Sequence, residues 1–317
     1  MTGFLLQQLV NALTIGAIYA LIALGYTMVY GVLRLINFAH SELFMSGAHI
    51  AFFLLAAASA FAGGAIGTIL VLLVFVATFV TVGLLGVGIE ATAYRPLRRA
   101  SRLAPMLSAL GVAIVVQNAV MLFVSRRPLP FPALLPPVSF DVAGAVVTVN
   151  QIFILVFSVL LMAGLAWFVN ATTFGVRIRA VSESLQTAQL LGINVNTPIS
   201  LIFFIGPGLG AVAGILYASY YGIAVFSMGF IVGLKAFTAA ILGGIGSIPG
   251  AMLGGFALGL LETFGAGLLP MLTNDAVGSE YRDIFSFSVL VLVLLFRPSG
   301  LLGEAVTEEG MVYKRDF

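Results

Sequence analysis

Apolar residues run in long blocks through the chain of 317 residues, and charged residues occupy short stretches between them. The blocks Leu43–Ile89 and Ser184–Leu234 contain no Asp, Glu, Lys or Arg. A helix needs about 20 mostly apolar residues to cross the hydrocarbon core of a bilayer, so each block holds one or more spanning helices. The predicted segments are 8–32, 41–61, 65–89, 104–124, 150–170, 199–220, 228–246, 250–269 and 282–297.

The composition agrees with this pattern. Apolar residues make up 61% of the chain and charged residues 8%, and the mean hydropathy is +1.16. A soluble domain has about 45–50% apolar and roughly 25% charged residues. We therefore expect an all-α, polytopic transmembrane helical bundle that forms a single domain over residues 1–317, with about eight or nine membrane segments, some of them discontinuous. The absence of cysteine excludes disulfides and thiolate metal sites, and basic residues are too sparse for a nucleic-acid footprint.

The distribution of Lys and Arg predicts the orientation, because these residues favour cytoplasmic loops. With the N-terminus outside, the cytoplasmic basic residues are Arg34, Arg95, Arg98, Arg99, Arg102, Arg177, Arg179, Arg297, Lys314 and Arg315. Only Arg126, Arg127 and Arg282 then lie outside. This orientation makes 125–150 an external, proline-rich loop, 171–198 a long cytoplasmic loop, and 298–317 a cytoplasmic tail.

The loop 171–198 contains an amphipathic segment. Ser182 is a candidate N-cap, with Glu183 in the first turn, where the helix dipole favours a carboxylate. Gly192 is suited to end the helix. The apolar positions of this segment recur at helical spacing and are Val181, Leu185, Ala188 and Leu191. Such a helix either lies on lipid headgroups or inserts into a groove on a cytoplasmic partner.

Two polar or glycine-rich breaks interrupt the apolar blocks, at 34–42 and 242–250. Irregular backbone at membrane depth is tolerated only inside protein or along a cavity, where it can bind a zwitterionic amino acid. Tight turns at the membrane interface explain the breaks equally well. With Lys235, they supply the candidate translocation-path residues, which are Asn37, Phe38, His40, Glu42, Lys235, Gly243, Gly244 and Ser247.

Few ionisable residues fall within the spans. Lys235 and Glu262 are the candidates, and a charge at that depth suggests function, although a snorkelling lysine or an interhelical Lys–Glu pair explains them as well. His40 and Glu42 are expected to form a hydrogen-bonded pair at a helix end. His40 and His49 do not have the spacing of a metal site, and no nucleophile and base occur together in a hydrolytic pattern.

Glycines recur every fourth residue at Gly206, Gly210 and Gly214, at Gly250 and Gly254, and at Gly255 and Gly259. Small residues at this spacing allow helix backbones to approach closely in lipid. We expect helix packing from these positions.

The sequence also lacks a phosphate-binding loop. Neither lysine of the chain, Lys235 or Lys314, follows a glycine, so the Gly-x-x-x-x-Gly-Lys-[Ser/Thr] motif is absent. If ATP drives transport, another chain binds it.

The chain resembles the LivH-type permeases of bacterial branched-chain amino acid ABC importers over nearly its whole length. The segments that carry the resemblance are Tyr19–Gly31, Ile36–His40, Glu183 with Leu191–Ile193, Gly233–Gly250, Tyr281–Asp283 and Pro298–Gly303. One departure is Ser41, where family members usually carry glycine.

The resemblance implies a complex with a second, LivM-type permease, two cytoplasmic ATPase subunits and a periplasmic amino-acid-binding protein, in the bacterial inner membrane. ATP and Mg²⁺ would then bind the partners, and this chain would hold no cofactor. The segment Ala180–Gly192 would be the coupling helix that docks on an ATPase, through Arg179, Val181, Glu183, Leu185, Ala188, Leu191 and Gly192. Leucine, isoleucine and valine are the leading solutes, with urea, short amides or other amino acids as alternatives. A stand-alone secondary transporter or a channel is a further alternative.

Overall fold

Helices form most of the computed structural model, which describes residues 2–61, 67–98, 100–101, 103–274, 278 and 281–303. Each predicted apolar segment is a helix: α1 (Thr2–Leu33), α2 (Ala39–Phe61), α3 (Thr68–Ile89), α4 (Leu103–Phe123), α5 (Val149–Ala171), α8 (Asn196–Tyr221), α9 (Met228–Gly243), α10 (Ile248–Leu272) and α11 (Arg282–Phe296). Among the described residues, 7 helices are long and apolar enough to cross a membrane, while α9 and the apolar part of α11 are shorter. The predicted all-α, polytopic bundle is confirmed.

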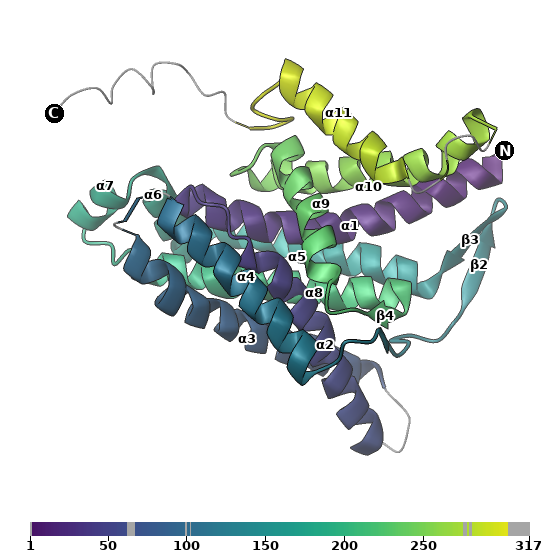
Figure 1. Ribbon diagram of the computed structural model, residues 1–317, viewed down its shortest axis with the longest axis horizontal. Coiled ribbons are helices and arrows are strands. Elements are labelled where there is room, and N and C mark those ends of the chain that lie inside the picture. The colour runs from purple at the N-terminus through teal and green to yellow at the C-terminus, as the bar shows by residue number, and fades with distance from the viewer. Residues whose placement is uncertain are drawn as a thin grey trace.

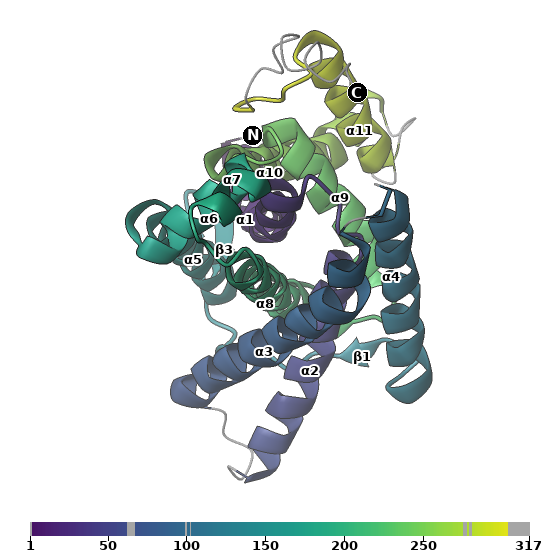
Figure 2. The ribbon, with the colours of Figure 1, turned by 90° about the vertical axis from the view of Figure 1, so that its left-hand side faces the viewer.

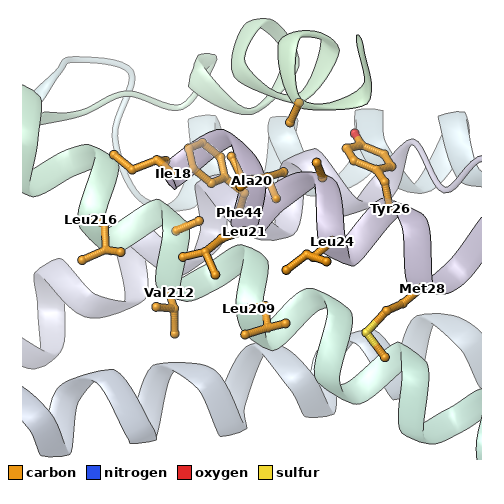
Figure 3. Packing of buried hydrophobic residues seen from close by; sticks show 14 of the residues in the cluster. Ile18, Ala20, Leu21, Leu24, Tyr26, Met28, Phe44, Leu209, Val212 and Leu216 are labelled. Carbon is orange, nitrogen blue, oxygen red and sulfur yellow. The ribbon is translucent and has the colours of Figure 1, made fainter. Parts of the chain in front are cut away.

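Helix α1 is the centre of the bundle, where it packs against α5, α8, α9 and α10 (Figures 1 and 2). It is apolar on all sides, as expected for a helix with little contact with solvent or lipid. Figure 3 shows Leu21 and Leu24 of α1 beside Leu209 and Val212 of α8, and all four side chains are at most 3% exposed. Close packing around α1 therefore holds the core together.

The recurring glycines lie where helices cross, as predicted. A side chain on Gly255 or Gly259 of α10 would collide with α1 at Ala20 or Gly16. On α8, Gly206 lies against Gly25 of α1. Van der Waals contact between backbones replaces the hydrophobic effect as the packing force between helices in lipid.

The outer helices turn apolar side chains outward. Leu73 of α3, Leu160 of α5 and Trp167 of α5 are 58%, 63% and 66% exposed. Soluble monomers rarely expose contiguous apolar surfaces of this kind. These helices are therefore suited to contact lipid or another membrane subunit.

The loop 125–150 contains no helix before α5, as its prolines predict. It forms a hairpin of β2 (Ser139–Val142) and β3 (Ala145–Thr148), which turns at Ala143 and Gly144, both with positive φ. Its β1 (Leu129–Pro130) pairs with β4 (Ile223–Ala224), which follows α8. The hairpin lies at the opposite end of the bundle from α6 (Thr173–Glu183) and α7 (Leu185–Leu190) (Figure 1). Of the predicted tail 298–317, residues 304–317 lie outside the described residues.

Candidate functional site

The first predicted break, between α1 and α2, runs from the exposed Arg34 to the buried Asn37 and His40. Arg34 has φ 52° and ends α1, and α2 begins at Ala39. The ring of His40 is fully buried, with Nε2 3.2 Å from the Ile22 carbonyl oxygen. At 1.5 Å per residue, that carbonyl lies about 16 Å along α1 from its end at Leu33. Between Arg34 and His40 the chain thus folds back into the bundle and does not simply turn at its surface.

Several buried polar atoms around this break have no hydrogen-bond partner among the described residues, namely Asn37 Nδ2, His40 Nδ1 and Glu42 Oε2. Asn37 accepts a hydrogen bond from the Tyr94 hydroxyl at 2.6 Å, and the Phe38 ring lies 6.3 Å from that of Phe237. The expected His40–Glu42 pair is wrong. Residues two apart on a helix do not face each other, and His40 bonds the α1 backbone instead.

Glu42 lies beside the N-terminus of α9. A Cβ built on Gly229, in the first turn of α9, would lie 2.6 Å from Glu42 Oε2, and the N-terminus of a helix attracts a carboxylate. Ser41 packs against Gly233, and its hydroxyl donates to the Phe38 carbonyl at 2.9 Å. The starts of α2 and α9 therefore meet within the bundle.

The second break covers residues 244–247 and not the predicted 242–250, because α9 continues to Gly243 and α10 begins at Ile248. Gly243 lies against Gly250, and Gly244 has φ 105° and lies against Gly303. Ser247 caps α10, since its hydroxyl accepts the Gly250 N–H at 3.2 Å. The tight contacts give Gly243 and Gly244 a packing role.

Lys235 and Glu262 form an interhelical ion pair. Lys235 Nζ lies 2.8 Å from Glu262 Oε1 and 2.8 Å from Asp283 Oδ1, and Glu262 Oε2 accepts a hydrogen bond from the Tyr19 hydroxyl at 2.7 Å. The lysine and glutamate side chains are 8% and 3% exposed. The network joins α1, α9, α10 and α11, so the structural alternative accounts for both buried charges.

A second buried charge cluster, centred on Glu90 directly after the predicted segment 65–89, was missed by the sequence analysis. Glu90 is fully buried. It accepts hydrogen bonds from Arg95 Nη2 at 2.7 Å and from Ser200 Oγ at 3.0 Å, and it pairs with Arg98. Arg98 also donates to Asn196 Oδ1 at 2.8 Å. The cluster ties the end of α3 to the first turn of α8.

The chain after α3 continues as a π-helix, η1 (Glu90–Tyr94), and a 3₁₀ turn, η2 (Arg95–Leu97). Single π turns occur often at functional sites. Here η1 carries Glu90 toward α8 and Tyr94 toward Asn37 of the first break. No local sequence pattern predicted the Glu90 cluster, because two of its members, Ser200 and Asn196, come from α8.

The amphipathic segment forms two helices, α6 and α7, and not one helix capped by Ser182. Ser184 is extended and caps α7, with its hydroxyl accepting the Thr187 N–H at 3.2 Å. Ser182 lies inside α6 and donates to the Arg179 carbonyl at 2.7 Å. Either serine satisfies the capping preference, so the sequence alone did not distinguish them. The end at Gly192 is confirmed. Gly192 has φ 77°, and the Ile193 N–H donates to the Ala188 carbonyl, as in a Schellman motif.

The predicted apolar face is divided by the interruption at Ser184. Val181 and Ala188 are 1% exposed and pack inward, while Leu185 and Leu191 are 39% and 72% exposed. Leu190, which the sequence analysis did not single out, is 88% exposed. Glu183 is exposed, and Arg179 donates to the Val169 carbonyl. The outward apolar surface of α7 therefore consists of these leucines, and Val181 and Ala188 anchor α6 and α7 to the bundle.

A cleft of about 680 Å³ opens at the α6–α7 end of the bundle. The end of α1, one face of α6, the α9–α10 connection and the segment after α11 line it. Of the predicted path residues, only Ser247 lines this cleft, together with Arg179 and Glu183 of the predicted coupling residues.

The chain matches known proteins over almost its whole length. A family model described as the permease component of the branched-chain amino acid transport system matches residues 8–294. The chain belongs to this family. It is 46% identical over 309 residues to the high-affinity branched-chain amino acid transport system permease protein BraD of Pseudomonas aeruginosa, covering 96% of this chain and 97% of the relative. It is 42% identical over 310 residues to the LivH permease protein of Escherichia coli K12, covering 96% and 98%.

The family resemblance found in the sequence is thus confirmed. The chain is a multi-pass membrane permease and not an enzyme. As a permease component, it works with other components of a transport system, and the ATPase is on separate subunits, consistent with the missing phosphate loop.

Proposed function

We propose that this permease is the membrane-spanning subunit of an ATP-driven, binding-protein-dependent importer for leucine, isoleucine and valine. The identity of 46% to BraD over nearly both full lengths carries this proposal. The first break supports it, because the unpaired polar side-chain atoms of Asn37, His40 and Glu42 inside the bundle suit a zwitterionic solute. Urea, short amides and other amino acids are the alternative solutes.

The proposed complex contains a second, LivM-type permease, two ATPases that hold ATP and Mg²⁺, and a periplasmic amino-acid-binding protein. This chain holds no cofactor in the proposal. The bias of Lys and Arg supports an orientation in the inner membrane with the α6–α7 end in the cytoplasm and the β2–β3 hairpin in the periplasm. The exposed leucines of α7 then face the ATPase.

Uptake by the complete reconstituted system tests the solute. We expect labelled L-leucine to accumulate, with isoleucine and valine as competitors, because one aliphatic pocket discriminates weakly between side chains that are isomers or differ by one methylene. Urea and acetamide are the negative controls and should not compete with leucine. Strong competition by urea or acetamide, with none by isoleucine or valine, would contradict the proposed solute class.

A further inference from the structure

The cleft at the α6–α7 end has the size of a small-molecule site. Its volume of about 680 Å³ falls within the roughly 300–1,000 Å³ typical of such sites. One wall is a single face of α6, with Ile178, Arg179, Ser182 and Glu183. Ile178 and Ser182 are four residues apart, and Arg179 is three and four residues from Ser182 and Glu183, so these positions lie on the same side of the helix. A ligand in the cleft would therefore touch the helix that the proposed function places next to the ATPase.

The cleft offers charges of both signs. Among the described residues, Arg34 and Glu183 form no side-chain hydrogen bond or ion pair. Arg179 is held in place by its hydrogen bond to the Val169 carbonyl. Guanidinium groups recognise carboxylates, and a carboxylate such as Glu183 is suited to pair with an ammonium group.

Arg34 is placed in the cleft by an unusual backbone. It has φ 52°, a conformation that costs an L-residue roughly 1–2 kcal/mol and that glycine adopts freely. It ends α1 with its N–H bonded to the Tyr30 carbonyl at 2.8 Å. Strained residues cluster at ligand sites, and here the strained residue supplies a free cation.

The rest of the lining is partly aliphatic. Ile241 and Ile245 lie at the α9–α10 side, and Leu302 comes from the segment after α11. An aliphatic wall beside an arginine and a glutamate matches one class of molecule, an α-amino acid with an aliphatic side chain. An inorganic anion would use the arginines but neither Glu183 nor the isoleucines.

We propose that this cleft binds an aliphatic amino acid from the cytoplasm. Arg34 and Arg179 would take its carboxylate, Glu183 its ammonium group, and Ile241 and Ile245 its side chain. The cytoplasmic location rests on the proposed function, whereas the binding itself does not. Because one wall is α6, an occupied cleft restrains this helix, so accumulated amino acid would slow the transport cycle.

Equilibrium binding of labelled L-leucine to the purified complex in nanodiscs, without ATP or binding protein, tests the site. We expect saturable binding that weakens about tenfold or more in Arg34→Gln and in Glu183→Gln, which is the effect of losing one hydrogen bond to a charged group. Arg177→Gln is the matched control. Arg177 lies on the same helix but outside the cleft, against the Phe174 ring, and this variant should bind leucine like the parent.

Two leucine analogues test which residue binds the carboxylate of the ligand and which binds its ammonium group. Leucinol lacks the carboxylate, so Arg34→Gln should not weaken its binding further. N-acetyl-leucine lacks the ammonium group, so Glu183→Gln should not weaken its binding further. Absent leucine binding, or binding equally affected by all three substitutions, would overturn the proposal. So would binding that none of them affects, because the leucine would then occupy another site.

Uptake measured on the same preparation separates the two proposals. Leucine uptake without binding at the cleft would overturn this inference and leave the proposed function standing. Binding that depends on Arg34 and Glu183, in a complex that transports no aliphatic amino acid, would overturn the proposed function and leave this inference standing.

Discussion

Replacing Lys235 with methionine is expected to destabilise the permease by about 3–5 kcal/mol, the usual effect of leaving a buried charge without its partner. Glu262, at 3% exposure, would keep the Tyr19 hydroxyl but lose the ammonium group 2.8 Å away. The loss is a large fraction of the stability of an ordinary folded protein. The melting temperature and yield of the complex in detergent measure it, and leucine uptake is expected to fall with them.

The double variant Lys235→Met with Glu262→Gln is the control for this prediction. It removes both charges of the buried pair, leaves the Asp283 carboxylate, which is 40% exposed, to solvent, and keeps an oxygen that accepts the Tyr19 hydrogen bond. Because a buried ion pair can be replaced by neutral groups at little cost, we expect stability and uptake to recover together. A double variant as stable as the parent but inactive in uptake would instead place Lys235 on the solute path.

Truncating Leu190 and Leu191 together to alanine is expected to uncouple ATP hydrolysis from uptake. These side chains are 88% and 72% exposed at the end of α7, where an apolar anchor can enter a groove on a partner. Loss of such an anchor costs about 2 kcal/mol, which is roughly a 30-fold weaker association. Co-purification of the ATPase, stimulated ATP hydrolysis and uptake measure the effect.

Leu160→Ala is the control, because Leu160 is also an exposed leucine, at 63%, but lies in the middle of α5 within a span. It should retain ATPase association and uptake. Normal coupling in the Leu190/Leu191 variant would assign α7 to the lipid headgroups, the alternative that the sequence left open.

The sequence predicted every spanning element because the bilayer imposes one requirement, a long apolar helix, on each of them. The predicted ends were less accurate where several residues satisfy the same local preference. Ser182 and Ser184 are both good N-caps, and only the extended backbone at Ser184 decides between them.

Contacts between distant segments were not predictable from local pattern. Glu90 is paired with Ser200 and indirectly with Asn196, both more than a hundred residues away. His40 bonds Ile22 and not its sequence neighbour Glu42. The Lys235–Glu262 pair was one of several readings of two isolated charges, and the packing of α9 on α10 selects it. Helix packing, which no short motif encodes, determines these partners.

The Glu90 cluster joins the start of α8 to the first break. Through Ser200 and Asn196 it holds the start of α8, which follows α7 directly, and through Tyr94 the same π-helix holds Asn37 in the first break. If an ATPase displaces α7 in the proposed complex, these hydrogen bonds would connect that displacement to the first break.

Component omission in proteoliposomes tests the central claim most directly, that this chain forms part of the solute path but does not supply the energy. With both permeases, the ATPases, the binding protein and ATP, labelled L-leucine should accumulate against its gradient. Without the ATPase subunits, accumulation should disappear. Sustained concentrative uptake by the permease in the absence of ATPase subunits would contradict the account and identify an independent transporter.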